Sequence, residues 1–151
     1  MINKAGKIFN YLKMTGYAEQ FLRYAAYADG KNASYFSALG DHYLEQKNYK
    51  SASGCFDTAA LLGSRDITLY SVNGTLKYTK LNNKIGALKD FNIALTIDPL
   101  NKEVLTNRGF YYFEIADYNA ALADFLAVKK IDPTNEKNIQ YIEACKDKIK
   151  K

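Results

Sequence analysis

Cysteine and histidine are scarce in this sequence. Of its 151 residues, two are cysteines, Cys55 and Cys145, and one is a histidine, His42. The cysteines lie far apart without C-x-x-C spacing, so neither a zinc site nor a disulfide framework is indicated. His42 follows Asp41 on an expected helix, where adjacent side chains do not face one another as an acid–base pair. We therefore expect no metal, no cofactor, no catalytic residues and no enzymatic activity.

Long apolar runs are also missing. No stretch approaches the roughly 18 apolar residues that a membrane-spanning helix needs. The opening "MINKAGKIFNYLKMTG" lacks the continuous apolar centre of a signal peptide. We expect no membrane insertion and a cytoplasmic location.

The net charge of +5 is moderate, and part of it lies in the last residues, "KDKIKK". A nucleic-acid-binding protein is expected to line a face or groove with lysine and arginine. A lysine-rich end is more typical of a solvated helix terminus, where positive charge complements the helix dipole. We expect no nucleic-acid partner.

The sequence does contain a repeated segment. Residues 90–99 read "DFNIALTIDP" and residues 124–133 read "DFLAVKKIDP", 34 positions later. The repeat extends to pairs separated by the same distance: Tyr78 and Tyr112, Ala87 and Ala121, Phe91 and Phe125, Ala94 and Val128, and Pro99 and Pro133. Self-similarity at one fixed period predicts a repeat architecture.

Earlier copies of the same pattern are present. One comprises Phe36, Leu39, Gly40, Tyr43, Ala52, Phe56 and Ala59, and it aligns with the next copy at an offset of 35 from Tyr43 onward. We attribute this slip to one extra residue in the turn "LLGSRD". A fainter copy covers Gly6, Phe9, Ala18, Leu22, Ala25 and Gly30.

Each unit is predicted to be a hairpin of two helices. Apolar residues recur at three- and four-residue spacing on both sides of turns such as "QKNYK", "LNNK" and "ADYN". Small residues such as Gly40 and Gly109 are expected where the two helices cross closely. Pro99 and Pro133 are expected to end the second helices.

The spacing aromatic-x2-Leu-Gly-x2-Tyr-x8-Ala-x3-Phe-x2-Ala resembles the tetratricopeptide repeat (TPR). The resemblance covers residues 33–135 strongly and roughly 3–32 weakly. The second copy departs from it with Ser71 and Thr75 at the aromatic and glycine positions and Gly74 one place early, and the third has Arg108 for leucine. The resemblance implies an all-α solenoid, a superhelix of stacked antiparallel hairpins. Its single domain would comprise a partial repeat (1–32), three repeats (33–67, 68–101 and 102–135) and a capping helix (136–151).

The resemblance also implies that the first helices of the units line a concave groove for a peptide or helix. The predicted groove residues are Asp41, Leu69, Asn73, Leu76, Asn107, Phe110 and Phe113. Asn73 and Asn107 lie 34 apart, and a carboxamide can both donate to and accept from a peptide backbone; the alternative is that they are simply exposed polar residues. Phe110 and Phe113 would serve as apolar anchors, unless they pack against the capping helix or a neighbouring unit.

These expectations favour an adaptor or scaffold that binds a segment of another protein. The alternative is a small TPR chaperone for a secreted or assembling client, although such chaperones tend to be acidic and this chain is basic. Self-association is a further option, because an incomplete first unit could expose an apolar edge.

Overall fold

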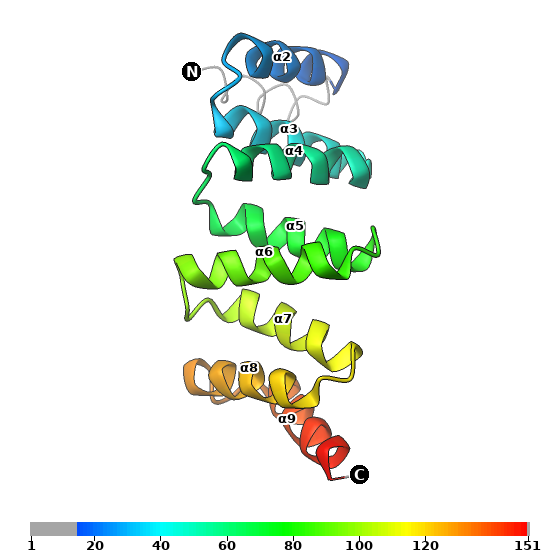
Figure 1. Ribbon diagram of the computed structural model, residues 1–151, viewed down its shortest axis with the longest axis vertical. Helices are drawn as coiled ribbons and strands as arrows, with labels where there is room; N and C mark the ends of the chain where they lie inside the picture. The colour runs from blue at the N-terminus through cyan, green and yellow to red at the C-terminus, as the bar shows by residue number, and fades with distance from the viewer. Residues whose placement is uncertain (1–14, 151) are drawn as a thin grey trace. The chain divides into compact units, whose positions relative to one another are not determined.

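The computed structural model describes residues 15–150, in which the chain forms helices and no strands (Figure 1). The helices are α2 (Thr15–Ala28), α3 (Ala33–Glu45), α4 (Tyr49–Leu61), α5 (Ile67–Thr79), α6 (Lys84–Ile97), α7 (Lys102–Glu114), α8 (Tyr118–Ile131) and α9 (Glu136–Ile149). The predicted all-α class is confirmed. Gly6 and Phe9 of the faint first copy lie outside the described residues.

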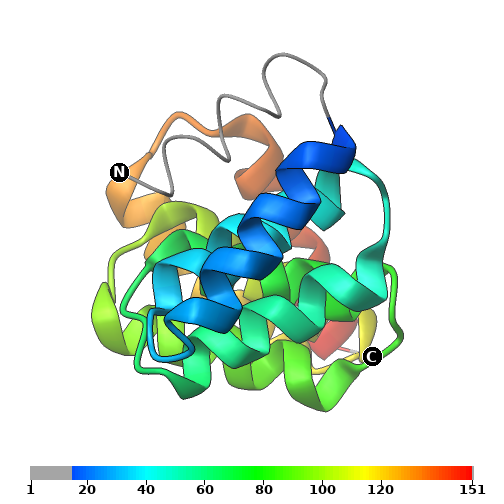
Figure 2. The same cartoon turned by 90° about the horizontal axis from the view of Figure 1, so that it is seen from above.

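The chain divides into two compact units that share α5. Among the described residues, unit 1 comprises residues 15–69 and 79–81, and unit 2 comprises residues 70–78 and 82–150. In unit 1, α3 packs against both α2 and α4, and Figure 2 looks down on α2 with these helices beneath it. Leu22 of α2 is fully buried and packs with Ala38 and Leu39 of α3. In unit 2, α8 packs between α7 and α9.

Asparagine and aspartate side chains set where most of the helices begin. The cap residues are Asn32, Asn48, Asn83, Asn101, Asp117 and Asn135, and each side chain accepts a hydrogen bond from a backbone N–H of the first helical turn. Such bonds satisfy amides that have no partner inside the helix. At the other end, α6 and α8 stop two residues before Pro99 and Pro133. The prediction for these prolines is confirmed.

A glycine faces a phenylalanine ring where the two helices of each hairpin cross. A Cβ added to Gly40, Gly74 or Gly109 would lie 2.6–2.8 Å from the ring of Phe56, Phe91 or Phe125 respectively. All three rings are at most 1% exposed. A larger side chain at the glycine would therefore have no free space, which confirms the prediction for Gly40 and Gly109 and extends it to Gly74.

The helix bounds correct the predicted position of the extra residue. The first helices of the three hairpins begin at residues 33, 67 and 102, and the second helices begin at residues 49, 84 and 118. The turn inside the second hairpin, residues 80–83, therefore has four residues, whereas the equivalent turns 46–48 and 115–117 have three. The extra residue lies in this turn and not in "LLGSRD".

Backbone hydrogen bonds show how the longer turn is accommodated. The cap amides of Asn48 and Asp117 each donate to a carbonyl five residues earlier, on Tyr43 and Tyr112, at 2.9 Å. The cap amide of Asn83 reaches six residues back, to Lys77, at 2.8 Å. Tyr43, Lys77 and Tyr112 each stand three residues after the crossing glycine. The same carbonyl position thus accepts in all three hairpins.

With this register the second copy no longer departs from the pattern at its glycine and aromatic positions. Gly74 is the crossing glycine, and Tyr70, four residues earlier, takes the place of Phe36. Tyr70 is buried, at 4% exposed. Each α5 residue consequently lies about 100° around the helix from the face that a constant period of 34 assigns to it.

We predict that Gly109→Val lowers the free energy of unfolding by about 1–3 kcal/mol, because the fully buried Phe125 ring has nowhere to move. The matched control is Gly54→Ala, since Gly54 is exposed on α4 and nothing lies within 4 Å of its added Cβ. The control should gain about 0.5–1 kcal/mol from helix propensity. Urea unfolding followed by circular dichroism measures both, and equal effects of the two variants would contradict the close-crossing interpretation.

Candidate functional site

The predicted groove residues of α5 lie in the interior. Leu69, Asn73 and Leu76 are 3%, 0% and 4% exposed. The register explains this burial, because these positions correspond in α7 to Val104, Arg108 and Tyr111 rather than to Glu103, Asn107 and Phe110. The expectation that Leu69, Asn73 and Leu76 face a groove is therefore corrected: as the chain is folded here, they belong to the packed interior.

Asn73 and Asn107 are likewise not equivalent residues. Asn107 stands two residues before its crossing glycine and Asn73 stands one residue before its own. One residue on a helix rotates a side chain by about 100°. The two carboxamides therefore lie on different helix faces and do not form a row.

By this register Asn107 and Phe110 correspond in α5 to Val72 and Thr75, and Tyr78, one turn after Thr75, corresponds to Phe113. The Asn107 amide nitrogen donates to the Thr75 hydroxyl at 3.3 Å, and that hydroxyl donates to the Ser71 carbonyl at 2.9 Å. We call Thr75, Tyr78, Asn107 and Phe110 the α5/α7 face; all four are half-buried. The bond to Thr75 uses one of the two amide hydrogens of Asn107, so this side chain can make further hydrogen bonds.

Tyr78 contributes part of its ring to the α5/α7 face, and its hydroxyl oxygen is buried. Its ring meets that of Tyr111 edge-on, with 5.5 Å between the centroids. Burial raises the pKa of the Tyr78 hydroxyl, and the nearby Glu114 carboxylate raises it further. The hydroxyl therefore stays protonated near pH 7.

Phe110 and Phe113 pack partly against α9. The Tyr141 ring lies 4.8 Å from the Phe110 centroid and 5.5 Å from the Phe113 centroid, and Phe113 also meets Tyr118 at 5.3 Å. The ammonium of Lys137 lies over the Phe110 ring, 5.4 Å from its centroid. Packing of Phe110 and Phe113 against the last helix was the alternative that the sequence analysis left open beside an anchor role. Both phenylalanines remain half-buried, so each keeps some accessible surface.

Asp41 is exposed on α3 in unit 1. It stands one residue after the crossing glycine Gly40, as Thr75 and Phe110 do after theirs. Its role in binding a partner stays a prediction.

Sequence reasoning missed two ion pairs between helices, one buried and one partly buried. Lys77 on α5 contacts Asp90 on α6 at 2.8 Å, and both side chains are less than 10% exposed. Arg108 on α7 donates two hydrogen bonds to Asp124 on α8, at 2.7 and 2.8 Å, and a third to Asn92 on α6 at 2.7 Å. The bonds to Asp124 raise the pKa of Arg108. Arg108 thereby ties three helices of unit 2 together.

The sequence repeat records only the acidic member of each ion pair. Asp90 and Asp124 both precede the core phenylalanine, so the period records them. Their cations stand at different positions, three residues after the glycine for Lys77 and one before it for Arg108. No sequence period links two such positions, and only the packing pairs them.

We predict that Asp90→Ala costs about 3–5 kcal/mol of stability, because it removes the carboxylate that the buried Lys77 contacts. The double variant Lys77→Met with Asp90→Leu should recover most of this loss, since apolar side chains of similar size need no partner. Urea unfolding of the single and double variants measures the difference. Equal destabilisation would contradict a pairing role for Asp90.

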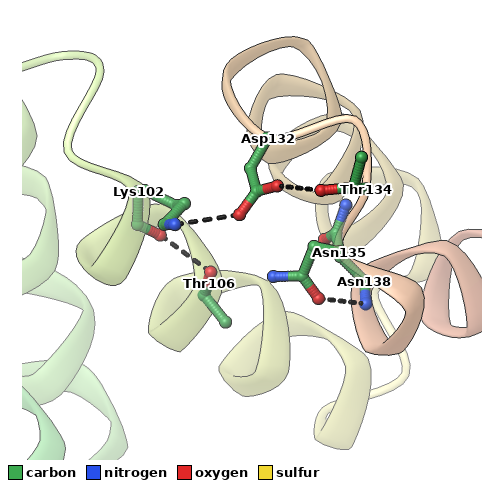
Figure 3. A network of polar contacts seen from close by, with 6 residues as sticks. All are labelled: Lys102, Thr106, Asp132, Thr134, Asn135 and Asn138. Atoms are coloured by element: carbon green, nitrogen blue, oxygen red, sulfur yellow. Dashed lines mark hydrogen bonds and ion pairs between the residues drawn. The ribbon is translucent and has the colours of Figure 1, made fainter.

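A polar network joins the first turn of α7 to the turn before α9 (Figure 3). Lys102 contacts Asp132 at 2.9 Å, and the Thr134 hydroxyl donates to the same carboxylate at 3.1 Å. Asn135 caps α9 through the Asn138 amide at 3.0 Å. The side chain of Asn138 donates to the Phe125 carbonyl at 2.9 Å. These bonds hold the start of α9 against α7 and α8.

The metal-ligating side chains and the two thiols are the remaining groups with reactive chemistry. Within residues 15–150, no group of three His, Cys, Asp or Glu side chains could hold a metal ion. Burial raises the pKa of Cys55 to about 11 and also raises the pKa of Cys145. Both thiols are therefore neutral near pH 7, which makes them poor nucleophiles.

The shifted pKa gives a chemical prediction. At pH 8 only about one molecule in a thousand should carry a Cys55 thiolate, because the raised pKa favours the neutral thiol. Iodoacetamide should thus label the folded protein slowly and the urea-unfolded protein rapidly, as read by mass spectrometry. Fast labelling of Cys55 in the folded protein would contradict its burial.

Antiparallel helix pairs with a glycine–phenylalanine crossing make this the TPR fold. No family model matches the chain. It is 28% identical over 134 residues to the Hsp70-Hsp90 organizing protein of Triticum aestivum, a match covering 89% of this chain and 23% of that protein. The figures are the same for Hsp70-Hsp90 organizing protein 1 of Glycine max. The chain thus spans less than a quarter of the length of these relatives.

Solved structures share the fold at low sequence identity. MamA has a TM-score of 0.87 at 15% identity, covering 97% of this chain and 80% of that one. YrrB, described as a TPR protein with an unusual peptide-binding site, has a TM-score of 0.84 at 21% identity, covering 95% and 74%. The first TPR of Spaghetti (RPAP3), bound to the HSP90 peptide SRMEEVD, has a TM-score of 0.70 at 18% identity. The match covers 80% of this chain and 94% of that one. None of the helices described here is both long and apolar enough for a transmembrane segment.

Proposed function

We propose that this chain is a protein-interaction module that binds a polypeptide segment of a partner on the α5/α7 face, and that it serves as an adaptor or scaffold. The observation that carries the proposal is the juxtaposition of Asn107 and Phe110 on one half-exposed helix face. Asn107 keeps hydrogen-bonding capacity beyond its bond to Thr75. Phe110 supplies an aromatic surface beside it.

Energetics require both kinds of contact. A net hydrogen bond contributes about 0.5–1.5 kcal/mol, whereas a micromolar complex needs about 8 kcal/mol. A carboxamide that holds a peptide backbone therefore cannot account for the affinity without apolar burial. Phe110, with Phe113 beside it, is the aromatic surface nearest to Asn107 along α7, and aromatic residues commonly dominate interface energy.

The comparisons support the proposal by analogy. A structural neighbour, the first TPR of Spaghetti, was solved with a bound HSP90 peptide, and YrrB is described as having a peptide-binding site. The relatives in sequence are Hsp70-Hsp90 organizing proteins. The proposed role, an adaptor that binds a segment of another protein, is consistent with these neighbours and relatives.

The proposal extends to location and partners. We place the protein in the cytoplasm, which is supported by free thiols at Cys55 and Cys145, as expected in a reducing compartment. The proposed partner is a polypeptide rather than a nucleic acid, and no enzymatic activity is proposed. Self-association is proposed only as an alternative use of exposed apolar side chains.

The test is selection of binding peptides from a displayed random library, followed by titration of the purified protein. We expect Asn107→Ala and Phe110→Leu each to weaken binding about tenfold or more, which corresponds to about 1.4 kcal/mol. Amide signals of α5 and α7 should shift on binding in NMR spectra.

Ile85→Ser is the matched control, because Ile85 is 86% exposed on α6 and outside the α5/α7 face. It should bind the selected peptides like the wild type. Unchanged affinity of both α7 variants, with folding verified by circular dichroism, would rule out this face.

A further inference from the structure

A second surface with one dominant charge lies on α8 and α9. Residues 126–131 and 143–150 contain five lysines and only two acidic residues, Glu143 and Asp147. The two helices are packed together: the Phe125 and Tyr141 rings stack at 5.3 Å, and Ile142 and Cys145 are buried. Lysines from both helices therefore share one part of unit 2.

Helix spacing shows which of these lysines lie together, because Glu143, Lys146 and Lys150 follow one another at three- and four-residue spacing and so share one face of α9. The Glu143 carboxylate contacts the Lys146 ammonium at 2.8 Å, and both side chains are well exposed. The hydrogen bond from Lys146 lowers the pKa of Glu143, and the charges of Lys146, Lys129 and Lys150 lower it further. Lys129 comes from α8 and the others from α9. We call Lys129, Lys146 and Lys150 the lysine patch; Glu143 lies among them.

The lysine patch also borders exposed apolar side chains. Leu126 stands one turn before Lys129 and is 40% exposed, and Ile149, beside Lys150, is 42% exposed. A surface that combines positive charge with scattered apolar groups suits a partner that carries both carboxylates and apolar side chains.

The chemistry of the surface favours a polypeptide over two other anionic partners. These two segments contain no aromatic residue for base stacking and no arginine for bidentate phosphate contacts, both of which nucleic-acid-binding surfaces commonly use. Two partly exposed apolar side chains offer little to insert into a bilayer. A carboxylate, by contrast, already binds here in the form of Glu143.

We propose that the lysine patch is a docking surface for an acidic segment of a partner polypeptide, and that Glu143 occupies Lys146 until a partner carboxylate replaces it. The bound Glu143 carboxylate is chemically identical to a glutamate side chain of the partner. This surface uses residues other than the α5/α7 face, so the inference goes beyond the proposed function. It predicts a contact that weakens with salt, because exposed charges are screened.

The test is fluorescence anisotropy with a labelled peptide that alternates glutamate and leucine, alongside a counterpart in which glutamine replaces glutamate. Glu143→Gln should tighten binding of the acidic peptide about threefold, because it removes the internal competitor. The double variant Lys129→Gln with Lys150→Gln should weaken it about tenfold. Raising the salt concentration from about 0.05 M to about 0.5 M should largely abolish binding.

The matched control is Lys50→Gln with Lys89→Gln, which changes net charge equally at exposed positions on α4 and α6. It should leave affinity for the acidic peptide unchanged, as should Phe110→Leu, so that failure of the α5/α7 face and failure of the lysine patch are distinguishable. Weaker or unchanged binding in Glu143→Gln, or equal loss in the control, would overturn the proposal. So would preferential binding to vesicles rich in phosphatidylserine or to an oligothymidine strand.

Discussion

In each of the three hairpins a phenylalanine ring lies against the Cα of a glycine on the facing helix. This contact brings the two helices so close that no other side chain fits at the glycine position, and it therefore fixes which residues of each first helix point inward. Cap residues then set where the helices start, and short turns make the two helices antiparallel. The burial of Leu69 and the partial exposure of Phe110 both follow from their positions relative to the crossing glycine.

Unit 2 adds polar contacts to this apolar scaffold. Arg108 joins α6, α7 and α8, and Lys77 joins α5 to α6 at a position where the other hairpins have tyrosine. A buried ion pair is costly to form and more costly to break. These pairs therefore give the second and third hairpins a defined pairing between particular helices, in addition to general apolar packing. The α5/α7 face lies on this well-held part of the chain.

The candidate site illustrates how far a sequence period can be trusted. Asn107, Phe110 and Phe113 lie on a partly exposed face of α7, as a pattern counted from Gly109 expects. Asn73 does not, because a constant offset of 34 crosses a turn that has one additional residue. An insertion of one residue leaves the helical pattern on both sides intact, so it can be assigned to either neighbouring turn. The helix bounds, the hydrogen bond from the Asn83 amide to the Lys77 carbonyl and the contact between Gly74 and Phe91 distinguish the two assignments.

The sequence by itself determined the repeated helical hairpins, the glycine at the crossings of the first and third hairpins and the prolines that end two helices. These features depend on local spacing and backbone geometry, which a linear pattern records directly. Tertiary structure decided the register of α5, the pairing of Lys77 with Asp90 and of Arg108 with Asp124, and the covering of Phe110 by Tyr141. Each of these depends on which side chains meet across helices, and a contact between distant residues leaves no period in the chain.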